Sequence, residues 1–298
     1  MSTSSNIANE IDAIIARAME EYRNAKGEDA FAEVETPAEE SVIREEPEPE
    51  HPEIPVNSQS ILVSEETSRF SGAVWFDNIQ AKQVTLAGVG GIGSYVTFLL
   101  SRLHPQVLYI YDDDNVEAAN MSGQLYSTDD IGSAKVNAMV RMAGQYSSYY
   151  DIFTYNERFN ENSTPTKIMI CGFDNMAARK DFFNAWKGLV HSLPEQERKE
   201  CLFIDGRLAA ESFQVLCIKG DDTFNMNKYE DKFLFRDSEA EETLCSYKQT
   251  TFMANMIGSV MVNLFVNFCA NECNPLIPRD LPFFTEYSAD TMFFKVVS

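Results

Sequence analysis

Four glycines stand where a short β-rich run gives way to an amphipathic segment. The run is residues 84–87, the segment is residues 92–103, and the glycines are Gly88, Gly90, Gly91 and Gly93. Glycine permits a tight turn and lets backbone N–H groups approach a phosphate, and the N-terminus of the helix that follows favours an anion. The spacing therefore predicts a phosphate-binding loop, although glycines also occur in turns that bind nothing.

A carboxylate follows at the distance that a ribose contact requires. Asp112 comes directly after the next β-rich run, residues 107–111, and lies 19 residues after Gly93. In nucleotide-binding α/β domains an acidic residue at this position accepts hydrogen bonds from ribose hydroxyls. The glycines and Asp112 together predict a nucleotide site, and they leave open whether the ligand is a dinucleotide or ATP.

The residues after Asp112 resemble the signature of the ThiF, MoeB and HesA family of ATP-dependent adenylyltransferases, which are related to ubiquitin-activating enzymes. In that family Asp-x-Asp-x-Val is followed by Asn-Leu-x-Arg-Gln and then by Gly-x-x-Lys. The matching residues are Asp112, Asp114, Val116, Asn120, Gln124, Gly132 and Lys135, and residues 171–175, which contain Asp174 and Asn175, resemble the family's Asp-Asn motif. The resemblance covers residues 69–268, with its motifs in the family's order.

The resemblance implies a role for each matched residue. The glycines, Asp112, Asp114, Asn120, Gln124, Lys135 and Asn175 are expected to bind ATP, with Lys135 as the positive charge that a phosphate site needs. Asp174 is expected to hold Mg²⁺ with water and phosphate oxygens. The implied reaction is attack of a substrate carboxylate on the α-phosphate, giving an acyl-adenylate and pyrophosphate. The implied substrate is the C-terminus of a ubiquitin-like or sulphur-carrier protein, or of a peptide.

Two positions depart from the family pattern. The arginine of Asn-Leu-x-Arg-Gln is replaced by Gly123. In the family an Arg-Tyr-x-Arg segment also reaches across a homodimer to the partner's ATP, and here Arg69 matches its first arginine alone. We therefore expect Arg69 to act in trans in a homodimer, and a salt bridge at the domain edge is an equally good interpretation.

Cys245 lies in a polar stretch about twelve residues before Gly258. In relatives that use thiol chemistry, a cysteine in the loop before the corresponding helix receives the acyl group as a thioester. Lys248 could lower the pKa of such a thiol. The alternative is a partly buried structural cysteine.

The resemblance also bears on zinc, because many family members carry two CxxC pairs that bind it. This chain has six cysteines and no CxxC, and Cys269 and Cys273 have no nearby Cys or His pair to complete a tetrahedral site. No zinc is expected.

Each matched residue also has a purely structural interpretation. Asp112 and Asp114 could form a solvated turn, Lys135 could be a surface lysine, and Asp174 with Asn175 could cap a helix. At the level of function, the chain could be a catalytically degenerate nucleotide-binding or interaction protein, or, more remotely, an NAD-dependent oxidoreductase.

The elements that must position these residues form an α/β pattern from residue 59 onward. It predicts a Rossmann-like doubly wound sheet with extra C-terminal strands. The expected strands are residues 84–87, 107–111, 168–171, 202–205 and 213–218, with more strands in the Phe-rich terminus, and the expected helices are residues 92–103, 132–146, 175–191 and 251–270. The stretch after Gly220 is expected to begin as a polar loop.

The first 58 residues are expected to lie outside this domain. Residues 1–26 predict an amphipathic helix, which could be a docking peptide or an exposed helix of no consequence. Residues 27–58 are rich in acidic residues and proline and are expected to be disordered. The predicted domains are therefore 1–26, 27–58 and 59–298.

Charge and hydropathy limit the partners. The 298 residues carry a formal net charge of −22, and residues 1–67 alone hold 17 acidic and four basic side chains. This charge argues against nucleic acid or an anionic membrane as the main partner. Residues 252–270 are uncharged over a membrane-like length, but Asn255 and Asn263 lie on a polar stripe, which favours a helix buried in a globular core. A cytoplasmic, thiol-reduced protein is expected.

Overall fold

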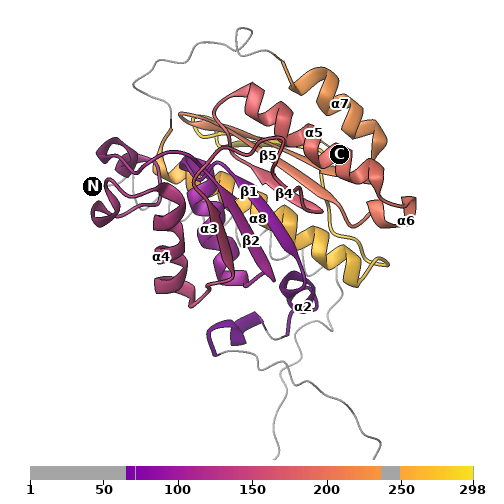
Figure 1. Ribbon diagram of the computed structural model, residues 1–298. Coiled ribbons are helices and arrows are strands. Elements are labelled where there is room, and N and C mark those ends of the chain that lie inside the picture. The colour runs from indigo at the N-terminus through magenta and orange to yellow at the C-terminus, as the bar shows by residue number, and fades with distance from the viewer. Residues whose placement is uncertain (1–64, 71, 236–248, 298) are drawn as a thin grey trace, which may run out of the picture. The chain divides into compact units, whose positions relative to one another are not determined.

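The computed structural model describes residues 65–70, 72–235 and 249–297 (Figure 1). The predicted N-terminal helix (1–26), the predicted acidic linker (27–58) and Cys245 lie outside the described residues, so these three predictions stay untested.

One eight-stranded sheet organises the fold, in the order β3-β2-β1-β4-β5-β6-β7-β8. The strands are β1 (Gln83–Ala87), β2 (Val107–Tyr111), β3 (Ile152–Tyr155), β4 (Ile168–Cys171), β5 (Leu202–Ala209), β6 (Ser212–Lys219), β7 (Phe284–Ser288) and β8 (Phe293–Val297). Strands β1 to β5 pair in parallel, and β6, β7 and β8 add on in antiparallel pairs. The predicted Rossmann-like sheet with extra C-terminal strands is confirmed.

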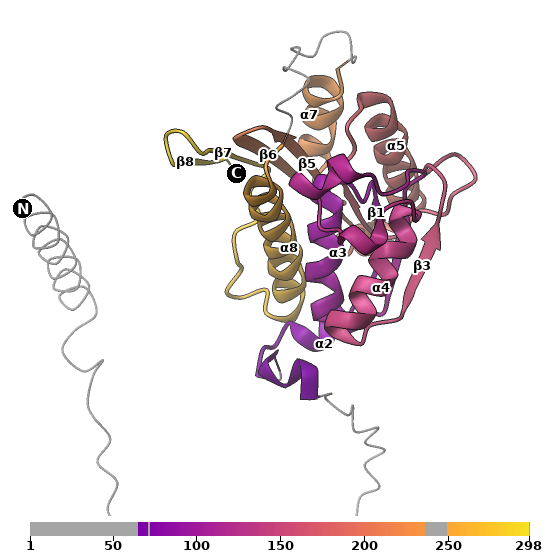
Figure 2. The same cartoon turned by 90° about the vertical axis from the view of Figure 1, so that its left-hand side faces the viewer.

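Helices cover both faces of the sheet, as parallel strands require. The α-helices are α2 (Phe76–Gln80), α3 (Gly91–Leu103), α4 (Lys135–Ser147), α5 (Met176–Ser192), α6 (Glu195–Arg198), α7 (Thr223–Phe233) and α8 (Thr251–Cys273), and the 3₁₀ turns are η2 (Glu65–Phe70), η3 (Ala118–Ser122) and η4 (Thr128–Asp130). Figure 2 shows α3, α4 and α8 on one face, with α5 and α7 on the other.

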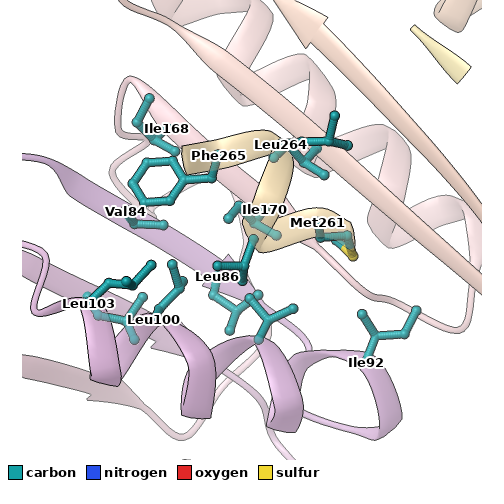
Figure 3. Packing of buried hydrophobic residues seen from close by; sticks show 14 of the residues in the cluster. Val84, Leu86, Ile92, Leu100, Leu103, Ile168, Ile170, Met261, Leu264 and Phe265 are labelled. Atoms are coloured by element: carbon teal, nitrogen blue, oxygen red, sulfur yellow. The ribbon is translucent and has the colours of Figure 1, made fainter. Parts of the chain in front are cut away.

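The larger core lies between α3, α8 and the sheet. Figure 3 shows Leu86 and Ile170 from the strands meeting Leu100 of α3 and Phe265 of α8, and all four are fully buried. By length and composition α8 could cross a membrane, but 56% of its most apolar window is buried inside the fold. Residues 252–270 therefore belong to a core helix, as predicted.

Helices α3 and α8 pack closely because Gly258 has no side chain. A Cβ on Gly258 would lie 3.0 Å from the Cβ of Tyr95. The hydroxyl groups of Tyr95 and Thr251 share a hydrogen bond near the start of α8. These contacts fix the start of α8 against the start of α3.

Several boundaries differ from the predictions for local reasons. Helix α4 begins at Lys135 rather than at 132, because Gly132 has a φ of +87° and Ala134 forms a β-bridge with Asn115. Strand β5 extends to Ala209 because it pairs with β6 along its whole length.

The short helices α2 and α6 and the 3₁₀ turns were not predicted, and neither were two longer elements. Strand β3 is one of them, and the other is α7, which replaces the first part of the expected polar loop. Asp222 caps α7 by accepting a hydrogen bond from the N–H of Asn225, and Met226 and Tyr229 are its buried residues. A cap followed by apolar residues three apart is the signal that the prediction overlooked.

Candidate nucleotide site

The glycine loop connects the end of β1 to the start of α3. Gly88 has a φ of +82°, which favours glycine, and its N–H donates to the carbonyl of Tyr111 at 2.9 Å. A Cβ on Gly93 would overlap the carbonyl oxygen of Gly88, so only glycine fits at position 93 when the first turn of α3 packs against the loop. Helix α3 begins at Gly91, and its N-cap, Gly90, supplies no side-chain cap. The start of α3 therefore presents N–H groups suited to an anion.

Asp112 holds this loop in place from the end of β2. Its Oδ2 accepts from the N–H of Val89 at 2.8 Å, and its Oδ1 accepts from the N–H of Asp114 at 3.0 Å. Burial raises the pKa of the Asp112 carboxyl, and the nearby Lys135 ammonium partly opposes that rise. Asp112 thus has a structural duty in addition to its predicted contact with a ribose.

Lys135 is the first residue of α4 and is only 6% exposed, so the surface-lysine interpretation is wrong. Its Nζ donates to Asp114 Oδ2 at 2.7 Å and lies 4.0 Å from Asp112 Oδ1. A buried ammonium that contacts two carboxylates is held in position. The structure brings Lys135, Asp112 and Asp114 together, and their predicted contacts with ATP stay a prediction.

The 3₁₀ turn η3 places the predicted amides. Asn120 Oδ1 accepts from the N–H of Glu117 at 2.8 Å, so its oxygen serves the turn itself. Gln124 has a buried Oε1 with no hydrogen-bond partner, and a Cβ on Gly90 would lie 3.9 Å from its Nε2. Rotating the carboxamide exchanges oxygen and nitrogen, so Gln124 can offer either an acceptor or a donor beside the loop. A buried carboxamide oxygen left unpaired next to a glycine loop fits a polar ligand.

One residue at this site was missed by the sequence analysis. The side chain of Gln249 lies against two glycines: a Cβ on Gly91 would overlap its Oε1, and a Cβ on Gly123 would lie 2.8 Å from its Cγ. In the sequence, Gln249 stands between Cys245 and the start of α8, and no motif there indicates which residues it contacts.

Asp174 and Asn175 follow β4 and have separate roles. Asn175 Oδ1 accepts from the N–H of Ala178 at 2.8 Å, so the helix-cap interpretation is confirmed for Asn175. Asp174 is exposed, and its Oδ1 accepts from Asn175 Nδ2 at 3.3 Å. Its carboxylate is accessible to a metal or a ligand at the carboxyl end of β4.

A second group of acids lies nearby. One carboxylate oxygen from each of Asp112, Asp113 and Asp114 lies within 4.8 Å of the others. Arg158 Nε donates to Asp113 at 2.9 Å, and this contact raises the pKa of Arg158. Within the described residues, this is the one group of three or more His, Cys, Asp or Glu residues with the spacing of a metal site.

A buried charge cluster lies behind the Asp174 loop. Asp205 is fully buried and accepts from Arg179, from Arg207 Nε at 2.8 Å and from the hydroxyl of Tyr229 at 2.9 Å, while the thiol of Cys171 donates to it at 3.1 Å. We call these five residues the Asp205 cluster.

The Asp205 cluster links strands β4 and β5 to helices α5 and α7, which lie on the same face of the sheet. Arg179 also donates to the carbonyls of Phe173 and Gly206, and Arg207 donates to the carbonyl of Phe233 at 2.8 Å. It therefore holds the residue before Asp174 and the last residue of α7.

Arg69 is not brought to the nucleotide site of its own chain. It is exposed in η2, and η2 and α2 lie at the end of the sheet where β1 begins, whereas the glycine loop follows the end of β1 (Figure 1). A role for Arg69 at a nucleotide would need a second chain.

Comparisons with known proteins give one family. The ThiF family model matches residues 64–297. Ubiquitin-like modifier-activating enzyme 5 of Culex quinquefasciatus is 32% identical over 94 residues, which are 32% of this chain and 24% of that protein. The enzyme of the same name from Aedes aegypti is 30% identical over 121 residues, 35% of this chain and 30% of that one. The chain thus spans about a third or less of the length of these relatives.

Solved structures share the fold. PaaA superposes with a TM-score of 0.57 at 16% identity, covering 75% of this chain and 65% of that chain. MccB of E. coli with ATP gives a TM-score of 0.54 at 16% identity, with the same two coverages. At such identities the likeness shows the fold alone.

Proposed function

Because this chain belongs to the ThiF family, we propose that it is an ATP-dependent adenylyltransferase that activates a C-terminal carboxylate. The observation that carries the proposal is the meeting of the glycine loop, the buried Lys135 and the unpaired carboxamide oxygen of Gln124 at the carboxyl ends of β1 and β2. This is where open α/β sheets bind their ligands.

In the proposed reaction the substrate carboxylate oxygen attacks the α-phosphorus of ATP. A new oxygen–phosphorus bond forms, the bond between the α-phosphorus and the bridging oxygen breaks, and pyrophosphate leaves with that oxygen. Loop N–H groups and Lys135 hold the phosphates, Asp112 and Asp114 lie on the ribose side, and Asn120, Gln124 and Asn175 line the site. Mg²⁺ held by Asp174 would neutralise phosphate charge. Alignment and charge neutralisation supply the rate.

The proposed substrate is the C-terminus of a ubiquitin-like or sulphur-carrier protein, or of a peptide. Two similarities support it: the relatives named ubiquitin-like modifier-activating enzyme 5, and the structure of E. coli MccB with AMPCPP and MccA, whose TM-score is 0.54 at 15% identity. In a later step the Cys245 thiolate would attack the acyl carbon and release AMP, leaving a thioester. We further propose a cytoplasmic homodimer in which Arg69 reaches the partner's nucleotide.

The test is ATP–pyrophosphate exchange with purified protein and Mg²⁺, with and without a ubiquitin-like protein that ends in Gly-Gly, and with a set of short peptides. Carboxylate-dependent exchange is expected. ATP binding without exchange across all substrates contradicts the catalytic proposal, and failure to bind ATP contradicts the nucleotide site itself.

A second function is favoured by one specific position. Gly123 provides no arginine where the family pattern has one, so the chain could bind nucleotide without catalysing transfer. Measurable ATP affinity with no exchange would identify this function. The remote alternative, an NAD-dependent oxidoreductase, predicts a change in reduced-cofactor fluorescence on mixing.

A further inference from the structure

We infer that Gln249 positions the nucleotide: its carboxamide donates to a phosphate at the start of α3, in a slot that Gly91 and Gly123 keep open. This inference rests on the proposed function, since it names a contact to the same ATP. Nothing in the glycine loop, the acidic motif or the Asp-Asn motif pointed to this residue.

One side chain fills the space beside two glycines from separate elements. Gly91 begins α3 and Gly123 follows η3, 32 residues later. A Cβ on Gly91 would overlap Gln249 Oε1 and lie 3.4 Å from its Nε2, and a Cβ on Gly123 would lie 3.0 Å from Nε2. The carboxamide thus lies between the start of α3 and the turn that carries Gln124.

Backbone conformation does not explain these two glycines. Among the described glycines, Gly88 and Gly132 have a positive φ, whereas Gly123 has a φ of −140°, which any residue adopts. Gly91, the first residue of α3, is not among the glycines with a positive φ either. The space taken by Gln249 supplies a reason for both.

Gln249 is held at this position by its neighbours. The next residue, Thr250, is the N-cap of α8, and its hydroxyl donates to the carbonyl of Ala210 at 3.2 Å. Thr251 shares its hydrogen bond with Tyr95 of α3. The backbone beside Gln249 is therefore anchored both to α3 and to the β5–β6 turn, which reduces the entropy lost when its side chain meets a ligand.

The chemistry of the slot suits a neutral donor. Position 123 offers no side chain, and the one cation proposed for the phosphates, Lys135, also donates to Asp114. The two N–H bonds of a carboxamide can reach phosphate oxygens without adding charge. With Gln124 beside Gly90, Gln249 makes the second of two amides that flank the loop.

The test is a double-mutant cycle on ATP affinity, measured by calorimetry with Mg²⁺ on the full chain. Gln249→Ala is expected to weaken ATP binding about 10-fold or more, the value of a hydrogen bond to a charged group. Gly123→Ala is expected to weaken it similarly, because its methyl group displaces the Gln249 side chain. The double variant should bind no more weakly than the weaker single variant, since both changes remove the same contact.

Matched variants separate this role from a structural one. Gly188→Ala adds a methyl where nothing lies within 4 Å, and Gln214→Ala removes a carboxamide that contacts Glu286 on the sheet, so both should keep the wild-type affinity. Gln249→Glu keeps the shape but replaces the donors with a negative charge, and should bind more weakly than Gln249→Ala. A purely structural role for Gln249 would lower the melting temperature and leave the affinity of the folded protein unchanged.

The outcomes distinguish this inference from the proposed function. Wild-type affinity in Gln249→Ala, or additive losses from Gln249→Ala and Gly123→Ala, would overturn the inference and leave adenylation standing. A wild-type protein that binds no ATP would overturn both.

Discussion

Asp174 is exposed after β4, and its carboxylate accepts one long hydrogen bond, from Asn175 Nδ2 at 3.3 Å. The helix behind it is capped by Asn175, and Phe173 is held by Arg179. Removing the Asp174 carboxylate should therefore leave α5 and the sheet intact while removing the proposed metal ligand.

We expect Asp174→Ala to lower ATP–pyrophosphate exchange by at least about a hundredfold, because charge neutralisation at the phosphates is lost. The melting temperature should stay at the wild-type value. Asp181→Ala, which removes an exposed carboxylate within the same α5 region, is the matched control and should keep full exchange. Normal exchange in Asp174→Ala would remove this residue from the metal site.

Asp112 predicts a pH dependence for ATP binding. Burial raises the pKa of its carboxyl above the ordinary value. If the ionised form accepts from the ribose, ATP affinity should fall with decreasing pH at a higher pH than for an exposed aspartate. Calorimetric titrations of ATP across pH 4–7 check this expectation. The range begins at the ordinary aspartate pKa of about 3.9 and extends upward, because the shift is upward. Asp112→Asn should bind ATP weakly with no such pH dependence, and an identical pH profile in that variant would contradict the assignment.

The thiols should divide sharply in reactivity. Burial raises the pKa of Cys171 and Cys201 to about 11 and that of Cys217 to about 12, and Cys269 is also buried, whereas Cys273 is exposed. Iodoacetamide near pH 7.5 should therefore modify Cys273 and leave the four buried thiols free, since the thiolate is the reactive form.

The same labelling tests Cys245. In a Cys273→Ser background, mass spectrometry should find Cys245 as the modified residue if it is a nucleophile. Substrate and ATP should then protect it through a thioester that hydroxylamine cleaves. Unreactive Cys245 under these conditions would favour the structural interpretation.

At the scale of elements, the Asp205 cluster holds three segments through one buried carboxylate. Asp205→Asn would leave two arginines, Arg179 and Arg207, without their buried counter-ion. We expect a loss of about 3–5 kcal/mol in the free energy of unfolding, measured by urea titration. Lys167→Ala is the control: Lys167 contacts Glu200 at 2.6 Å near the surface, and such pairs contribute about 1 kcal/mol or less. Equal losses in the two variants would contradict the structural weight given to Asp205.

Elements defined by local signals were predictable from the sequence. Strands β1, β2 and β4 are short apolar runs, and the loop after β1 needs glycine for its own backbone, so their positions follow from nearby residues. Helix α7 has an equally local cap at Asp222 and was overlooked among polar neighbours.

Features that depend on distant contacts were not predictable. Asp205 ends an expected strand, 202–205, and the sequence does not tell which arginines and which tyrosine reach it. Gln249 contacts Gly91 and Gly123 from 158 and 126 positions away, so nothing near it in the sequence reports the contact. Asn120 and Asp112 also accept hydrogen bonds from the backbone N–H groups of Glu117 and Val89, and the sequence did not indicate these contacts.

At the scale of the whole molecule, Arg69 predicts complementation between two inactive chains. If Arg69 acts on a partner's nucleotide, Arg69→Ala and Asp174→Ala should each lack exchange alone. A 1:1 mixture should recover about a quarter of wild-type activity, because half of the dimers are mixed and each holds one complete site. Co-expression with two different tags and exchange assays on the mixed dimer check this. If a confirmed mixed dimer recovers no activity, the result favours the other interpretation of Arg69, a salt bridge at the domain edge.

Helix α8 completes the core by packing on α3 and the sheet. Gly258 of α8 lies 163 residues after Tyr95, the α3 residue that it packs against. A ribosome must therefore make most of the chain before the apolar face of α3 and β1 can be covered. Contacts so distant in sequence slow folding, and the uncovered face is a surface for chaperones or for aggregation in the meantime. A nascent chain halted before residue 251 should consequently behave as a chaperone client, however well its nucleotide loop has formed.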